Sequence, residues 1–259
     1  MQIVKKFDLE MAHIVRNAWS KRCSKSIHGH TYTVEVVLER SDQGMFDDGQ
    51  MVIDFGLVKK HIGPFIDSFD HATMLWAKDE DPELVNFFKD HFDRVIVCNQ
   101  SSSCEMMSAI LLVGIERLLA SNDETDMVEV TKVIVHETKS GRAECDCDSE
   151  WVTYVEEQRV LEEIFISDPI IDEWSYEFVN TYVAAGIGSF GVAPREDENS
   201  FISLNDDTDL SDEDYFAYQH EEAEAEAEAP AIEAGPENLP GSLLALAFAS
   251  LLGPKDEEQ

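Results

Sequence analysis

The chain has few basic residues for its length. It carries 19 Lys and Arg side chains against 54 Asp and Glu, which gives a formal net charge of -35. Contacts to phosphate need clustered Lys and Arg, so this charge balance argues against a nucleic-acid-binding surface. Binding to an anionic membrane surface is disfavoured for the same reason.

Long apolar runs and export signals are also lacking. The first residues, MQIVKKFDLEMAH, have neither the apolar segment nor the small-residue cleavage site of a signal peptide. No apolar run reaches the roughly 18 residues that a membrane-spanning helix needs. The five cysteines are an odd number in a chain without an export signal, which favours reduced thiols and a cytoplasmic protein.

The acidic charge is concentrated towards the C-terminus. Residues 1–150 carry 16 basic and 27 acidic side chains, and residues 151–259 carry 3 and 27. A salt-adapted protein would spread its acidic residues over every surface. The composition predicts a folded domain over residues 1–158 and a largely disordered acidic, low-complexity extension over 159–259. A short apolar segment, LPGSLLALAFASLLG, lies near the end and could dock on this protein or on an unknown partner.

Hydrophobic periodicity predicts an α+β domain. The segments MQIVKKFDLEMAHIV and HTYTVEVVLER are expected to be strands, and MVIDF a short return strand. Helices are expected in DFGLVKKHIGPFIDSFD, capped by Asp54, and in SCEMMSAILLVGIERLLAS, capped by Ser102 or Ser103. Strands are expected again in MVEVTKVIVHETKSG and in DSEWVTYVEEQ.

Three histidines are candidate metal ligands. His28 and His30 are two residues apart, so on an extended strand both side chains leave the same face. His13, at the end of the first predicted strand, is the available third ligand. Three histidines with one open position are typical of a catalytic zinc site. The alternative is that His28 and His30 only flank a glycine in a turn.

Cys23 has three possible roles: a fourth metal ligand, a reactive thiol or a buried small apolar side chain. Arg16, Lys21, Arg22 and Lys25 surround it in the sequence. Positive charge lowers a thiol pKa and raises the fraction of reactive thiolate, and the same cluster suggests an anionic substrate. The alternative is a solvated basic loop.

Three further carboxylate positions are candidates. Asp70 precedes His71 and could orient its imidazole for proton transfer. Glu105 opens the second helix, where it could simply stabilise the helix dipole. Glu137 closes a strand and could accept paired N–H bonds from a heterocycle, or could be a solvated strand end.

Taken together, these motifs resemble a known family. His13 after the first strand, C-x4-HGH leading into a strand, VIDF before a helix, DHATML, a serine-rich turn before Glu105, and VHETKSGRA follow the order of the 6-pyruvoyl-tetrahydropterin synthase and 6-carboxy-tetrahydropterin synthase family. The resemblance covers residues 1 to about 147. SKS after Cys23 and SSSCE depart from the family pattern.

The resemblance implies the tunnelling fold, an antiparallel four-stranded sheet with two helices on one face. In that family three subunits join their sheets into a barrel and two trimers form a homo-hexamer, with active sites between subunits. His13, His28 and His30 would hold Zn²⁺, Cys23 would be the catalytic base, and Asp70 with His71 would transfer protons. Glu137 would anchor the pterin ring, supported by Glu105.

The implied substrate is 7,8-dihydroneopterin triphosphate. CSKSIHGH resembles the compact Cys-to-HGH spacing of the bacterial enzymes. This resemblance favours the lyase that makes 6-carboxy-tetrahydropterin, acetaldehyde and triphosphate for 7-deazaguanines such as queuosine, in a bacterium or a phage-infected cell. The alternative product is the pyruvoyl pterin of biopterin synthesis. A second alternative is a non-catalytic scaffold derived from a synthase. A zinc module built on Cys98, Cys104, Cys145 and Cys147 is weaker, because their spacing does not match structural zinc sites.

Overall fold

The computed structural model describes residues 1–40, 51–78 and 81–188. The chain divides into two compact units, Met1–Glu196 and Asp197–Gln259, and the second lies outside the described residues. The acidic tracts from residue 195 onward and the apolar segment near the C-terminus therefore have no structural description. Within the described part of the chain, no helix is long and apolar enough to cross a membrane.

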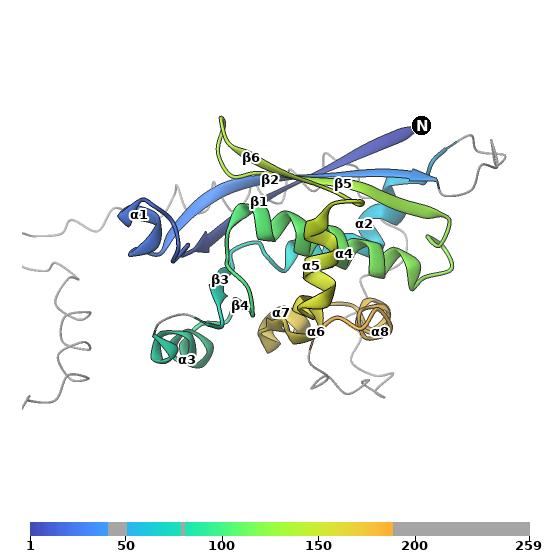
Figure 1. Ribbon diagram of the computed structural model, residues 1–259. Coiled ribbons are helices and arrows are strands. Elements are labelled where there is room, and N and C mark those ends of the chain that lie inside the picture. Colours follow the sequence, from blue (N-terminus) through green and yellow to red (C-terminus); the bar gives the residue numbers. More distant parts are fainter. Residues whose placement is uncertain (41–50, 79–80, 189–259) are drawn as a thin grey trace, which may run out of the picture. The chain divides into compact units, whose positions relative to one another are not determined.

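Seven strands form one sheet in the order β6-β5-β2-β1-β3-β4-β7 (Figure 1). They are β1 (Gln2–His13), β2 (His28–Arg40), β3 (Thr73–Trp76), β4 (Val95–Cys98), β5 (Val128–His136), β6 (Arg142–Asp146) and β7 (Phe165–Ile166). The four strands β1, β2, β5 and β6 are antiparallel, as the family resemblance implies, although β6 was not among the strands expected from the sequence. The short strands β3 and β4 extend this sheet in parallel beyond β1.

The described residues contain eight helices. They are α1 (Lys21–Ser24), α2 (Phe55–Asp67), α3 (Pro82–His91), α4 (Cys104–Ala120), α5 (Glu150–Glu157), α6 (Val160–Glu163), α7 (Asp168–Asp172) and α8 (Tyr176–Ala184). The two expected helices, α2 and α4, are confirmed together with their caps. Asp54 accepts a hydrogen bond from the backbone of Gly56, and Ser103 accepts one from Met106.

The core lies between the sheet and α2 and α4, which cover one face of it (Figure 1). Side chains alternate along β1, so that Leu9, Met11 and His13 are buried and their neighbours are more exposed. Gly114 lets α4 approach α2 closely, because a Cβ at this position would lie 2.7 Å from Cζ of the buried Phe65. The close packing of α2 against α4 therefore requires a glycine at position 114.

Two expected strands are wrong. Residues 51–54 of the MVIDF segment are not in a strand. The segment DSEWVTYVEEQ forms helix α5, with Ser149 accepting a hydrogen bond from the backbone of Trp151. Its β-branched residues suit a strand locally, but Val155 is buried where α5 packs on α4. Tertiary packing thus outweighs local propensity.

Folded structure also continues past the division expected at residue 158. Helices α6, α7 and α8 follow it, and Val160, Leu161 and Ile170 are fully buried in the same core as the sheet. In this stretch, apolar residues recur at helical spacing between the acidic ones. The segment therefore has an apolar face, which its overall composition does not reveal. The folded region described here thus includes residues 159–188.

Candidate active site

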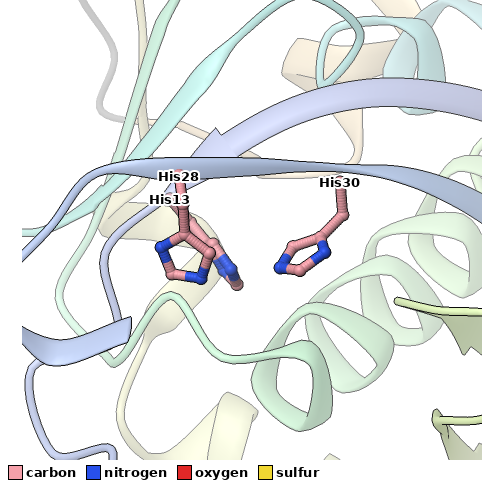
Figure 2. Close-up of side chains that lie close together, drawn as sticks. All are labelled: His13, His28 and His30. Carbon is pink, nitrogen blue, oxygen red and sulfur yellow. The ribbon is translucent and has the colours of Figure 1, made fainter. Parts of the chain in front are cut away.

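Three histidine side chains meet where β1 ends and β2 begins. His13 is paired directly with His28 across the two antiparallel strands, and His30 lies two residues further along β2. Their rings leave the same side of the strands, the side that the helices cover (Figure 2). One nitrogen of each ring lies within 4.8 Å of the others, and this is the candidate metal group found in the described residues. The three residues expected as zinc ligands are thus brought together.

Backbone carbonyls orient two of these rings. His13 Nδ1 donates to the carbonyl of Ser102 at 2.8 Å, and His28 Nδ1 donates to that of Ser26 at 3.0 Å. Each ring then keeps Nε2 without a hydrogen, available to a metal ion. Carbonyls in this role are a general feature of histidine metal sites, since they fix the tautomer and the ring orientation. The donor set therefore fits a divalent transition metal such as Zn²⁺.

His13 is the most buried of the three histidines, with 1% of its surface exposed. Burial lowers the pKa of His13, and the neighbouring His28 and His30 lower it further, against the opposing effects of the Ser102 carbonyl and of Glu137. A lowered pKa keeps the imidazole neutral near pH 7. The neutral form is the one that binds a metal ion.

Glu137 lies beside the histidines, directly after β5. Its Oε1 is 3.7 Å from His13 Nε2, and 31% of its side chain is exposed. The hairpin that follows is closed by hydrogen bonds from the backbone N–H groups of Glu137 and Thr138 to the carbonyl of Gly141. The Glu137 carboxylate therefore lies next to the three histidines and is partly exposed, so it can contact a molecule bound there.

Tyr32 is a site residue that sequence reasoning missed. Its hydroxyl lies 3.3 Å from both ring nitrogens of His13, and its side chain is fully buried. Burial and the negative charge of Glu137 raise its pKa, so the phenol stays protonated. The signal was present in the sequence, because position 32 is the next residue after His28 and His30 on the same face of β2.

Cys104 is also close to Glu137, but its thiol is not activated. It donates to the carbonyl of Val135 at 3.3 Å, and burial raises its pKa to about 12. A thiol with so high a pKa is protonated at neutral pH. Cys104 is thus a packing residue rather than a nucleophile.

Cys23 lies in α1, in the connection between β1 and β2, and is half-buried. Its carbonyl accepts a hydrogen bond from Val15, two residues after His13, which holds α1 next to the end of β1. Lys21 and Arg22, on the same short helix, are exposed. In the described residues the metal group consists of the histidines without Cys23.

Asp70 and His71 form a pair in the turn that follows α2. Asp70 Oδ2 accepts from His71 Nδ1 at 2.9 Å, and Oδ1 accepts from the backbone of Glu10 at 2.6 Å. His71 lines a hollow of about 380 Å³ together with Glu10, Ala12, Gly29 and Thr31. Met11 and His30 line the same hollow, and the turn is hydrogen-bonded to the backbone of Glu10, so the pair lies at the edge of β1.

Glu105 lies exposed in the first turn of α4. In the described part of the chain, it is Ser102, three residues earlier, whose carbonyl contacts the histidines, and no contact links them to the Glu105 carboxylate. The structure therefore brings together His13, His28, His30 and Glu137. Cys23 lies on an adjoining helix, and Asp70 with His71 lies apart.

Comparison with known proteins places this arrangement in a family. A family model described as 6-pyruvoyl tetrahydropterin synthase matches residues 2–148. Two relatives named 6-carboxy-5,6,7,8-tetrahydropterin synthase, from Helicobacter pylori strains J99 and 26695, are 40% and 39% identical over 137 residues. Each match covers 51% of this chain and 66% of the relative, slightly less than two thirds of its length.

Two solved structures align with part of the chain. An uncharacterised protein from Wolinella succinogenes aligns with a TM-score of 0.41 and 22% identity, over 57% of this chain and 98% of that one. The 6-pyruvoyl tetrahydropterin synthase of Caenorhabditis elegans aligns with a TM-score of 0.36 and 20% identity, over 56% and 94% of the two chains. The family model spans more than half of the chain and all of β1 to β6. The chain therefore belongs to the 6-pyruvoyl tetrahydropterin synthase family.

Proposed function

We propose that this protein is a zinc-dependent 6-carboxy-5,6,7,8-tetrahydropterin synthase. It would convert 7,8-dihydroneopterin triphosphate into 6-carboxy-5,6,7,8-tetrahydropterin, acetaldehyde and triphosphate, on a route to 7-deazaguanines such as queuosine. The observation that carries the proposal is the meeting of His13, His28 and His30 beside Glu137. The names of the two Helicobacter pylori relatives support this choice of product.

The three histidines would hold the zinc ion, His13 and His28 through their Nε2 atoms. The lowered pKa and the burial of His13, the orientation of His13 by the Ser102 carbonyl and the orientation of His28 by the Ser26 carbonyl support this assignment. Bound there, zinc would supply Lewis acidity towards the hydroxyl groups of the substrate side chain.

Cys23 would be the base that removes a proton from the substrate side chain. The exposed Lys21 and Arg22 on the same short helix support this role, because their positive charge attracts a triphosphate. Glu137 would anchor the pterin ring by accepting its N–H groups, with Glu105 in a supporting position. Tyr32, held protonated between His13 and Glu137, would fix the orientation of both.

Asp70 and His71 would complete the site of a neighbouring subunit. Within one chain they lie at the edge of β1, outside the group of three histidines, which supports an active site made between subunits. The edge of β1 is paired with β3 only at Ala12 and His13, so among the described residues Gln2–Leu9 offers an open strand edge. We propose a trimer or hexamer in which a neighbouring strand covers this edge, in the cytoplasm.

The test is to incubate the purified, zinc-loaded protein with 7,8-dihydroneopterin triphosphate and to follow pterins and acetaldehyde by mass spectrometry. A carboxy-pterin with acetaldehyde is the expected result. A pyruvoyl pterin without acetaldehyde would assign the biopterin reaction instead. No turnover by a zinc-replete oligomer would defeat the enzymatic proposal and leave a scaffold or binding role.

A further inference from the structure

Arg94 connects the Asp70–His71 turn to the helices that follow residue 158. It immediately precedes β4, and its side chain is 21% exposed. Its Nε donates to the backbone carbonyl of Asp70 at 2.8 Å, and its Nη2 donates to that of Asp67 at 3.0 Å. One guanidinium thus holds the carbonyls at both ends of the turn that leads from α2 to His71.

This turn has an unfavourable backbone conformation. His71 has φ of 52°, in the left-handed region that a residue with a side chain rarely adopts. Such a conformation persists only where surrounding contacts hold it. Here the backbone of His71 donates to the carbonyl of Glu10 at 2.6 Å, and Arg94 holds the residue before it. The orientation of His71 towards Asp70 therefore depends on contacts from outside the turn.

Glu173, which follows α7, holds Arg94 in turn. Arg94 Nη1 donates to both carboxylate oxygens of Glu173, at 2.7 and 2.6 Å. Ser167 fixes the backbone on either side of Arg94, since its hydroxyl accepts from Val95 at 3.1 Å and donates to the carbonyl of Asp93. Both Ser167 and Glu173 lie beyond residue 148, where the match to the family model ends.

We infer that Arg94 is a positioning residue for the proposed proton-transfer pair Asp70–His71, and that Glu173 holds Arg94 in place. The folded part of the extension then contributes to catalysis without touching substrate. The kinetic test of this inference rests on the proposed function, whereas the contacts by which Arg94 holds the turn do not depend on any substrate.

The test uses the full-length, zinc-loaded protein and the variants Arg94→Ala, Arg94→Lys and Glu173→Gln. We expect Arg94→Ala to lower kcat about 10-fold to 100-fold, because a misplaced catalytic group costs this much, with KM and zinc content little changed. Arg94→Lys should recover part of kcat, since an ammonium group can reach one carbonyl. Glu173→Gln should lower kcat only about twofold to fivefold, because a partly exposed ion pair restrains the guanidinium weakly.

A matched control is the pair Arg117 and Glu162. Arg117 is also 21% exposed, and its Nη1 lies 3.1 Å from Glu162, so this pair likewise links the family domain to the later helices. Glu162→Gln should leave kcat unchanged. A loss of kcat in Glu162→Gln equal to that in Glu173→Gln would overturn the inference, because the effect would then be one of general stability. If Arg94→Ala does not fold, the kcat values of Arg94→Lys and Glu173→Gln test the inference instead.

A crystal structure of Arg94→Ala, or of Arg94→Lys if alanine prevents folding, tests the positioning without substrate. We expect the turn to relax, with His71 leaving the left-handed region or losing its contact to Asp70. An unchanged turn would refute the positioning role whatever the kinetics show. If the wild-type protein has no turnover, the proposed function fails, and this structural comparison alone decides whether Arg94 holds the turn.

Discussion

His13 and His28 face each other as direct partners across β1 and β2, with ring centroids 4.6 Å apart. This pairing makes the metal group depend on strand register. Sliding one strand by a single residue would turn one ring to the opposite face. The hydrophobic alternation that fixes the register of the sheet therefore also builds the site.

Replacing His28 with alanine should remove the metal ion. The variant keeps two of the three ligands, and two histidines alone bind zinc much more weakly than three. The fold should survive because the side chain is only half-buried. Zinc content measured by mass spectrometry checks this, with His91→Ala as control, since His91 is an exposed residue on α3. An unchanged zinc stoichiometry in His28→Ala would defeat the assignment of the site.

Replacing Cys23 with alanine should abolish turnover and leave zinc content and assembly intact. Loss of a general base costs about 10²-fold to 10⁴-fold in rate. Turnover of 7,8-dihydroneopterin triphosphate is the measurement, and Cys147→Ala, which removes an exposed thiol after β6, should behave as wild type. Loss of zinc in Cys23→Ala would instead make Cys23 a ligand.

Glu137→Gln should weaken substrate binding by about fivefold to 150-fold. The amide keeps the shape of the side chain but replaces one acceptor oxygen with a donor, which leaves a pterin N–H without a partner and costs about 1–3 kcal/mol. Binding of a pterin to the zinc-loaded protein by calorimetry is the measurement. Glu129→Gln, an exposed change on β5, the strand that precedes Glu137, is the control. Equal affinities for wild type and Glu137→Gln would rule out the anchoring role.

Gly114→Ala should destabilise the fold by about 1–3 kcal/mol, because the added Cβ overlaps the buried ring of Phe65. The gain in helix propensity, about 1 kcal/mol, offsets only part of this cost. Gly63→Ala is a matched control in α2, where the nearest atom to a Cβ is Cγ of Lys59 at an ordinary 3.6 Å. Thermal unfolding should show a lower Tm for Gly114→Ala only. Equal Tm values would mean that α2 and α4 can move apart freely.

Truncation after residue 158 should prevent stable folding. It removes Leu161, Ile164 and Ile170, which are almost fully buried in the main core. Loss of a single such side chain costs about 2–5 kcal/mol, and a whole domain is stable by only about 5–15 kcal/mol. Truncation after residue 188 removes none of these contacts and is the control. A cooperative thermal transition for the shorter protein, at the same Tm, would contradict this prediction.

The sequence was informative where local physics and packing agree. The alternation in β1 and β2, the caps Asp54 and Ser103, and the apolar length of α4 are local signals, and all of these elements are present. The segment around Val152 and Val155 is different, because its residues suit a strand or a helix equally. Burial against α4 decided in favour of the helix.

For the site, spacing alone placed His28 and His30 on one face of a strand, and the motif order identified the remaining candidates. Tyr32 could have been found by the same two-residue period. Ser102 could not, because its contribution is a backbone carbonyl, which no side chain reveals. Neither could Arg94, whose partners Asp70 and Glu173 are 24 and 79 residues away in the chain.

By itself, the sequence thus determined the residue types, the periodicities and the family motifs, because these features depend only on residues that are close together in the chain. Only the tertiary structure decided which residues meet. Strand register set His13 opposite His28, a hydrogen bond to Glu10 put His71 at the edge of β1, and the packing of α5 to α8 joined the early extension to the core. These outcomes follow from contacts between segments that are distant in the chain. The free energy of such contacts cannot be read from any single local segment.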